Sequence, residues 1–408
     1  MEEDKRMVRL YFRMSLTREK DVLRRYAERY HGLVMEAHIL ELYSDSTLNF
    51  LRDIPNPFLI DPVTYKFALP AIVEQTDKKW FEKLVDAYNM PIDAISPRIL
   101  PDNLSASVLR RFVESVLNYQ RGIATKLQST GLLTWFLEEN VFCQRDIFSP
   151  EYITAPYFVI ESINHTNHQD WLDINENIID LAKENLNANE KLLAVIALGE
   201  ESFLSDEVIH EVLQRYRNLK ADAYALWVSN FNEVTQAPDV LRRFMRFAKG
   251  LKDSTILFNF YGGYFSLLLA KKELFDGVMQ GITVAEYRDP FVLGGFAVPR
   301  YYLPKLHLFT SHEIAGLLSS VSKLKCECPV CNKLRGFDDL VNMSVADTML
   351  HFVYNRILEF EEVKTKSLED LLESLTETYT FMDELQKRSK RNLVYYGHLK
   401  SWIDVLKE

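Results

Sequence analysis

Three of the four cysteines lie within six residues of one another: Cys326, Cys328 and Cys331. The resulting C-x-C-x-x-C pattern puts three thiolates on one tight turn, where they can converge on tetrahedral zinc. His351, in the helical pattern DTMLHFVYNRILEF, is the expected fourth ligand, and His307 and His312 are the alternatives. Because four protein ligands leave no open position, the sequence predicts a structural zinc site. Free surface thiols and a redox cluster are the competing interpretations.

The rest of the chain must position these residues, and in it short apolar segments alternate with helical patterns. Eight segments are typical of buried strands: residues 7–13, 33–42, 57–61, 156–162, 191–198, 222–229, 255–261 and 274–279. Such alternation fits an eight-stranded α/β barrel or a doubly wound open sheet. We favour a (β/α)8 TIM barrel, because there are eight strands and none is followed by a glycine-rich dinucleotide or phosphate loop.

Two regions interrupt the alternation and define the predicted domains. Residues 62–155 are mainly helical, and we expect them to form a helical insertion on the face where such barrels hold their active sites. After residue 290 the pattern changes to a hairpin, the cysteine cluster and charged helices. We therefore predict a barrel over 1–290 and a zinc-binding helical appendage over 291–408.

Composition limits the classes of function. The 408 residues include 48 Lys plus Arg and 58 Asp plus Glu, and the net charge of −10 excludes a histone-like nucleic-acid binder but allows a local basic face. The sequence has no apolar run long enough to span a membrane, and its start does not match a signal peptide. Four cysteines are too few for a disulfide framework. We therefore expect a cytoplasmic protein.

The cysteine pattern and its histidine, behind an eight-stranded barrel, resemble the zinc appendage of the tRNA-guanine transglycosylase superfamily. Two further segments fall in that family's order: F-D-G-V at 275–278 is similar to its F-D-x-V strand, and F-L-I-D at 58–61 ends where the family has the Asp of its D-S-G-G-F-Q loop. The loops depart from the family pattern after the third, fifth and sixth strands, where this chain has P-V-T-Y-K-F at 62–67, L-G-E-E at 198–201 and W-V-S-N-F-N-E at 227–233. The chain therefore resembles a divergent branch, similar to the DNA-guanine transglycosylases that insert 7-deazaguanines.

The resemblance implies exchange of one base for another at C1′ through a covalent intermediate. Asp276, expected at the C-terminal end of the last strand, would be the nucleophile, and Asp61, at the end of the third strand, would be the general acid and base. Both strand ends would open onto the same face of the barrel. A helix cap is the competing interpretation for Asp276, and Pro62 imposes an extended or turn conformation on Asp61.

Four further residues are candidate contacts to the substrate. Glu161, at the end of the fourth expected strand, lies where the family has a carboxylate that reads the deazaguanine ring, and a buried salt bridge is the alternative. Gly262 and Gly263 would let a base or phosphate approach the backbone closely, unless they form an ordinary tight turn. Tyr65 lies in the segment that replaces the family's loop after Asp61.

Nucleic-acid contacts are expected from cations near aromatic residues and from the basic run QKRSKRN at 386–392. Arg300 precedes two tyrosines beside the predicted zinc site. Solvated helix faces are the alternative interpretation for every basic cluster. The candidates in the basic run are Lys387, Arg388 and Arg391.

These observations favour a glycosyltransferase, a base-exchanging transglycosylase that replaces guanine in DNA with a 7-deazaguanine derivative through a covalent Asp–nucleotide intermediate. A transglycosylase acting on tRNA and a non-catalytic nucleic-acid-binding partner subunit are the alternatives. The expected cofactor is zinc, and the expected partners are DNA or tRNA and a 7-deazaguanine base. Helper proteins or a homodimer are compatible with the sequence.

Overall fold

The computed structural model describes most of the chain. The described residues are 8–14, 16–90, 98–137, 148–162, 166–252, 255–282, 286–291, 300–389 and 393–408. Within these ranges no helix is both long and apolar enough to cross a membrane.

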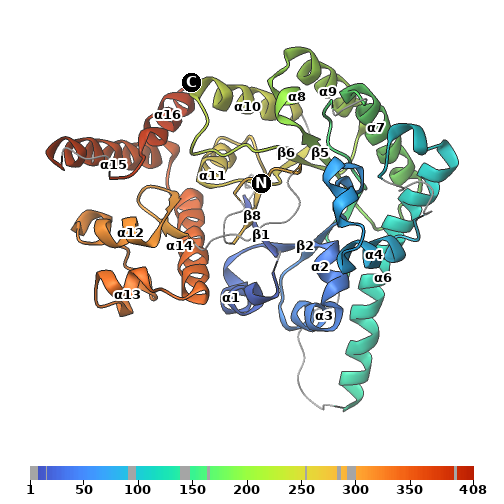
Figure 1. The fold of residues 1–408 in the computed structure, drawn as a ribbon, viewed down its shortest axis with the longest axis horizontal. Helices are drawn as coiled ribbons and strands as arrows, with labels where there is room; N and C mark the ends of the chain where they lie inside the picture. Colours follow the sequence, from blue (N-terminus) through green and yellow to red (C-terminus); the bar gives the residue numbers. More distant parts are fainter. Residues whose placement is uncertain are drawn as a thin grey trace, which may run out of the picture.

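Eight parallel strands form a nearly closed barrel surrounded by helices, which confirms the predicted fold class (Figure 1). The strand order is β3-β2-β1-β8-β7-β6-β5-β4. The edge strands β3 and β4 approach each other where the backbone N–H of Glu151 donates to the carbonyl oxygen of Phe58 at 2.9 Å. The strands are β1 (Arg9–Met14), β2 (Gly32–Glu36), β3 (Phe58–Asp61), β4 (Ile153–Thr154), β5 (Leu192–Leu198), β6 (Ala223–Val228), β7 (Ile256–Asn259) and β8 (Gly277–Gly281).

The strands form because their sequences are almost continuously apolar. Every residue of β5 (LLAVIAL) and β6 (AYALWV) is buried, as expected for parallel strands that are covered on both faces. Adjacent strands pair in parallel along the whole of β6, whose six residues lie beside residues 193–198 of β5. The parallel arrangement places all C-terminal strand ends at one end of the barrel.

Two of the expected strands differ from the structure. The segment 33–42 supplies only β2, because from Ala37 onward its apolar residues recur at helical spacing and form a helix. The fourth strand is the two-residue β4 rather than residues 156–162, of which only Ile160 forms an isolated bridge to β5. A short apolar run does not by itself show which of its residues will pair.

Helices cover the outside of the barrel, and the segment 62–155 is mainly helical as predicted, although it also contains β4. Its longest helix, α6, packs against α3 and α7. The helices of the barrel and the insertion are α1 (Lys20–Arg25), α2 (Ala37–Leu42), α3 (Ser44–Asp53), α4 (Lys79–Ala87), α6 (Ala106–Leu137), α7 (His168–Glu184), α8 (Glu200–Leu204), α9 (Asp206–Leu219), α10 (Pro238–Leu251) and α11 (Tyr264–Lys271).

The C-terminal region lies on one side of the barrel, drawn in orange and red in Figure 1. It begins with the antiparallel pair β9 (Tyr301–Leu303) and β10 (Leu308–Thr310). Helix α14 packs against α1 and α11, and α16 packs against α10 and α15. The helices are α12 (His312–Ser319), α13 (Phe337–Val341), α14 (Val345–Thr365), α15 (Leu368–Ser389) and α16 (Gly397–Leu406).

Candidate active site and metal centre

Charged side chains from three neighbouring strands meet at the C-terminal end of the barrel. Arg13 comes from β1, Glu36 from the end of β2 and Asp61 from the end of β3, and all three are buried. Arg13 Nη2 lies 2.5 Å from Asp61 Oδ2 and 3.7 Å from Glu36 Oε1. The structure thus places Asp61 at the end where TIM barrels hold their active sites, as predicted.

Asp61 is held as an acceptor by three donors of different kinds. Besides the Arg13 guanidinium, the hydroxyl of Tyr157 donates to Asp61 Oδ1 at 3.0 Å and the backbone N–H of Val63 donates to the same oxygen at 3.0 Å. Val63 has φ +49°, which turns the chain sharply directly after Asp61-Pro62. Charge-assisted hydrogen bonds of this kind stabilise a carboxylate anion in a buried site.

More basic side chains lie within ion-pair distance of Glu36 than of Asp61. Arg288 Nη1 lies 2.8 Å from Glu36 Oε1, and Lys66 Nζ lies 3.7 Å from Oε2. Burial alone would raise the pKa of Glu36, but Arg288 and Lys66 outweigh it and hold this pKa well below its usual range. Burial and the charge of Arg288 lower the pKa of Lys66 to about 8. Burial also lowers the pKa of His38, beside Glu36, to about 3, so His38 is neutral at physiological pH.

Aromatic residues line the same end of the barrel. Tyr65 stacks on Tyr157 with ring centroids 5.6 Å apart and contacts Trp227 edge to face at 5.0 Å. Tyr65 is fully buried, and among the described residues its hydroxyl has no hydrogen-bond partner. The candidate Tyr65 therefore lies beside Asp61's partner Tyr157, with a free polar group.

The expected position of Asp276 is wrong. Asp276 lies before β8, at the N-terminal end of the barrel, because pairing with β7 begins only at Gly277. Its carboxylate accepts the backbone N–H of Leu257 at 2.7 Å and forms an ion pair with Lys252. It fixes the starts of β7 and β8, at the end of the barrel opposite to Asp61. The two aspartates therefore do not form one site.

Glu161 lies at the predicted end of the barrel, but its carboxylate is bound by protein donors. It accepts hydrogen bonds from the backbone N–H of Ser202 at 3.1 Å, from the Ser202 hydroxyl at 3.0 Å and from the N–H of Ser162 at 2.9 Å. A Cβ on Gly199 would collide with this carboxylate. Glu161 thus closes the turn between β5 and α8, and its partners among the described residues are neutral hydrogen-bond donors rather than the salt-bridge cation of the alternative interpretation.

Gly262 and Gly263 follow β7 at the same end of the barrel. The N–H of Gly262 donates to the carbonyl oxygen of Met279 in β8 at 3.2 Å. A Cβ on Gly263 would lie 2.8 Å from Glu233 Oε2 and 3.2 Å from Glu286 Oε1. Because Gly263 has no side chain, the carboxylates of Glu233 and Glu286 can approach its backbone. This contact was not predicted from the sequence.

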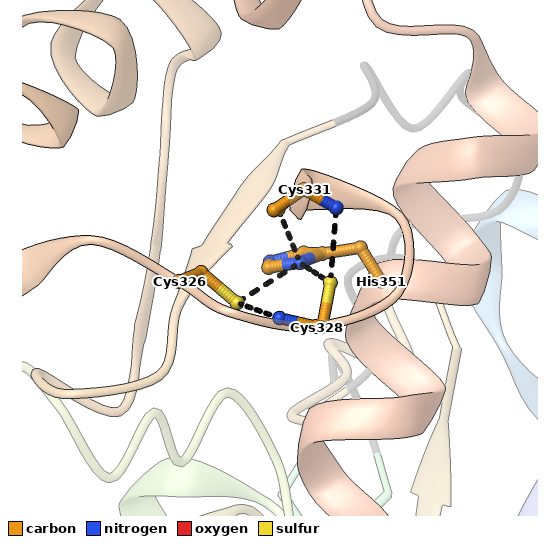
Figure 2. A group of neighbouring side chains, drawn as sticks. All are labelled: Cys326, Cys328, Cys331 and His351. Carbon is orange, nitrogen blue, oxygen red and sulfur yellow. Dashed lines mark hydrogen bonds between the residues drawn. The ribbon is translucent and has the colours of Figure 1, made fainter. Parts of the chain in front are cut away.

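The cysteine cluster and His351 form a group that can hold a metal ion (Figure 2). Their ligand atoms all lie within 4.8 Å of one another. The thiol sulfurs of Cys328 and Cys331 each lie 3.3 Å from His351 Nδ1, and Cys326 Sγ lies 3.7 Å from it. The three cysteines come from the loop between α12 and α13, and His351 comes from α14. The structure thus brings the four predicted ligand residues together.

The surroundings orient these ligands. His351 Nε2 lies 2.7 Å from the carbonyl oxygen of Tyr302, which holds the proton on Nε2 and leaves Nδ1 facing the sulfurs. Backbone N–H groups of Cys328 and Cys331 point at the sulfurs of Cys326 and Cys328, at 3.5 and 3.3 Å. The ring of Tyr301 stacks on His351 at 4.2 Å. A donor set of this composition and orientation suits a four-coordinate metal ion.

The two alternative histidines lie outside this group. His307 Nδ1 lies 2.6 Å from Glu359 Oε1, and the ring of His307 stacks on Tyr264. His312 Nε2 lies 3.1 Å from the hydroxyl of Thr348.

The structure describes three of the four nucleic-acid candidates, and two of these three pair with neighbouring acidic residues. Arg300 is exposed, but the tyrosines that follow it are buried and cannot stack on bases. Lys387 and Arg388 are 74% and 80% exposed and pair with acidic residues one turn earlier in α15. Arg391 lies outside the described residues.

Sequence reasoning missed several charged residues at the barrel end. Arg13 and Glu36 stand inside otherwise apolar strand sequences, and a charge at a buried strand position is a signal that was available. Glu233, Glu286 and Arg288 lie in connections after β6 and β8, where no periodic pattern indicates that the two glutamates are buried. A search of protein-family models and of curated proteins finds no match to this chain.

Proposed function

We propose that this protein is a base-exchanging transglycosylase that replaces guanine in DNA with a 7-deazaguanine derivative. The observation that carries the proposal is the position of Asp61, at the C-terminal end of β3 in a barrel whose appendage carries a Cys3His group. The TIM-barrel fold is common among enzymes. tRNA is the alternative substrate, because the described residues include no element that distinguishes the two nucleic acids.

The chemistry proposed for Asp61 is nucleophilic. Because Asp276 lies at the opposite end of the barrel, Asp61 takes the covalent role that the family resemblance implied for Asp276. A carboxylate oxygen of Asp61 forms a bond to C1′ while the bond from C1′ to the base nitrogen breaks and its electron pair leaves with the base. In the second step the incoming base attacks C1′ and releases the carboxylate. Arg13 and Tyr157 hold Asp61 in place for both steps.

We propose zinc as the metal ion of the Cys3His group. Three thiolates and one imidazole are a common zinc ligand set, and four protein ligands leave no position for substrate. Zinc supplies folding energy in such a site and takes no part in the reaction. The residues of this chain that do the chemistry are those at the barrel end.

A non-catalytic partner subunit is the competing function. It is favoured by one observation, the position of Asp276 away from Asp61, which removes the carboxylate pair that the family resemblance implied. Its prediction is binding of nucleic acid without exchange.

The test is incubation with radiolabelled guanine and separate pools of DNA and tRNA, with Asp61→Asn protein as the matched control. We expect label to enter DNA with the natural protein and not with the variant. Label in tRNA alone would establish the tRNA alternative. If the protein binds nucleic acid but no label enters either pool, the proposed transglycosylase activity is refuted and the non-catalytic partner subunit is favoured.

A further inference from the structure

Two buried glutamates approach each other at the end of the barrel that holds Asp61. Glu233 follows β6 and Glu286 follows β8. Both carboxylates face Gly263, as the distances from its absent Cβ show: 2.8 Å to Glu233 and 3.2 Å to Glu286. Neither residue has a role in the steps assigned to Asp61.

The protein supplies this pair with fewer cations than anions. Arg356 Nη2 lies 2.6 Å from Glu286 Oε1, but Arg356 Nη1 also lies 3.1 Å from Glu359. The hydrogen-bond donors to Glu233 are neutral: the hydroxyl of Ser266 donates to it, and the Ser266 N–H lies 3.4 Å away. Among the described residues, the guanidinium of Arg356 is therefore shared by three buried carboxylates, of which Glu359 also has His307 as a basic neighbour.

This imbalance is relieved when the glutamates hold a proton. Burial raises the pKa of Glu286 from its ordinary value of 4.5 to about 7, although Arg356 opposes the shift and the charges of Glu233 and Glu359 add to it. Burial also raises the pKa of Glu233. Two carboxylates at one site that share a proton are a recurrent source of general acids.

A free polar group marks the place of a ligand beside the pair. The amide nitrogen of Gln280, on β8, donates to Glu286 Oε1 at 3.0 Å. The amide oxygen of Gln280 is buried and, within the described ranges, has no hydrogen-bond partner. A buried acceptor without a donor fits a ligand that presents an N–H group. The edge of a purine-like base offers such a group next to a ring nitrogen that can take a proton.

The pair is connected to the Asp61 site through the chain. Arg288, two residues after Glu286, binds Glu36, which also lies 3.7 Å from the Arg13 that holds Asp61. Residues 286–288 thus border both groups of charges. A nucleophilic carboxylate on one side and a proton donor on the other are the two components that base exchange needs.

We propose that Glu286, sharing its proton with Glu233, is the general acid and base for the nucleobase, and that Gln280 binds the base edge. This inference rests on the proposed function. The Glu286 acid donates its proton to a ring nitrogen of the leaving base as the bond to C1′ breaks, and the Glu286 carboxylate takes a proton from the incoming base as the new bond forms. Arg356 is a positioning residue that holds Glu286 from α14.

The first test needs no enzymatic activity. Because Glu286 binds its proton more tightly in the folded than in the unfolded protein, its contribution to stability is present at low pH and is lost as the pH rises through about 7. Between pH 5 and pH 8.5 the unfolding equilibrium constant of the natural protein should rise roughly 70-fold relative to that of Glu286→Gln. Urea titrations of the full chain at both pH values measure this ratio.

Two variants serve as controls for the first test. Glu233→Gln removes the second carboxylate and should shrink the pH effect, which a purely structural role would not do. Glu359 lies on the other side of Arg356. Burial alone would raise the pKa of Glu359, but Arg356 and His307 outweigh burial and lower this pKa. The titration of Glu359 therefore lies below the range from pH 5 to pH 8.5, and Glu359→Gln should keep most of the pH effect that Glu286→Gln removes. Parallel pH dependence of the natural protein and Glu286→Gln would overturn the proposal.

The second test separates proton donation from the rest of the reaction. DNA that contains 7-methylguanine carries a leaving base that is already cationic and departs without a proton. Glu286→Gln should slow the release of guanine by about 10²–10⁴-fold and leave the release of 7-methylguanine near the natural rate. Equal losses with both bases would overturn the assignment. If the natural protein releases neither base, the proposed function fails, while the result of the urea titrations still decides the protonation of Glu286.

Discussion

Asp276 is expected to stabilise the barrel and to play no part in base exchange. In Asp276→Ala the backbone N–H of Leu257 loses its carboxylate acceptor, and Lys252 loses its ion-pair partner. A buried donor left without an acceptor costs about 1–3 kcal/mol. The Lys252 side chain is 14% exposed, so water compensates part of the lost ion pair, and we assign it about 1 kcal/mol. The free energy of unfolding should therefore fall by about 2–4 kcal/mol.

The matched variant Asp276→Asn separates the two contributions. It keeps an oxygen for the Leu257 N–H and loses only the charge, so we expect a loss of about 1 kcal/mol. Denaturant titration measures both variants, and the labelled-guanine assay measures exchange in the same samples. Both variants should exchange guanine at the natural rate under conditions where they are folded. A fully folded Asp276→Asn protein without exchange would refute the assignment of Asp276 to a structural role.

The other predictions concern the metal group, the nucleophile and the tail. Purified protein should contain about one zinc ion per chain by atomic emission, and Cys328→Ser should lose it and expose residues 300–360 to limited proteolysis. Asp61→Asn should abolish a denaturant-resistant adduct with nucleic acid while the circular dichroism spectrum is retained. Charge reversal at Arg388 and Arg391 should weaken nucleic-acid binding and lower its salt slope by roughly one unit for each lost phosphate contact; an unchanged slope would restrict the tail to solvation.

The Cys3His group could be predicted from the sequence because three of its four residues are close together in the chain. Three of its ligands lie within one turn of the chain, and the spacing alone brings their sulfurs together. His351 could be chosen over His307 and His312 because it stands in a clear helical pattern that can pack against the turn. The structure shows that the two rejected histidines have other partners. The fold class could also be predicted, since eight apolar segments that alternate with helical patterns remain recognisable when their bounds are wrong by several residues.

The candidate active site was less accessible, because it depends on where each strand starts and ends. A shift of a few residues moves Asp276 from one end of the barrel to the other. Asp61 was placed correctly because Pro62 ends the strand directly after it. Contacts such as Arg288 with Glu36 join residues that are far apart in the sequence, and no pattern in a single sequence reports them.

One end of the barrel is supported by Trp402, a residue of the C-terminal helix α16. Trp402 of α16 is fully buried, donates its indole N–H to the carbonyl oxygen of Glu233 at 2.9 Å and stacks on Phe265 of α11. During synthesis the ribosome releases β8 more than a hundred residues before it releases Trp402. The eight strands can therefore all have emerged while the loop that carries Glu233 still lacks its support. We therefore expect the end of the barrel that carries Glu233 to reach its final packing only after α16 has been synthesised.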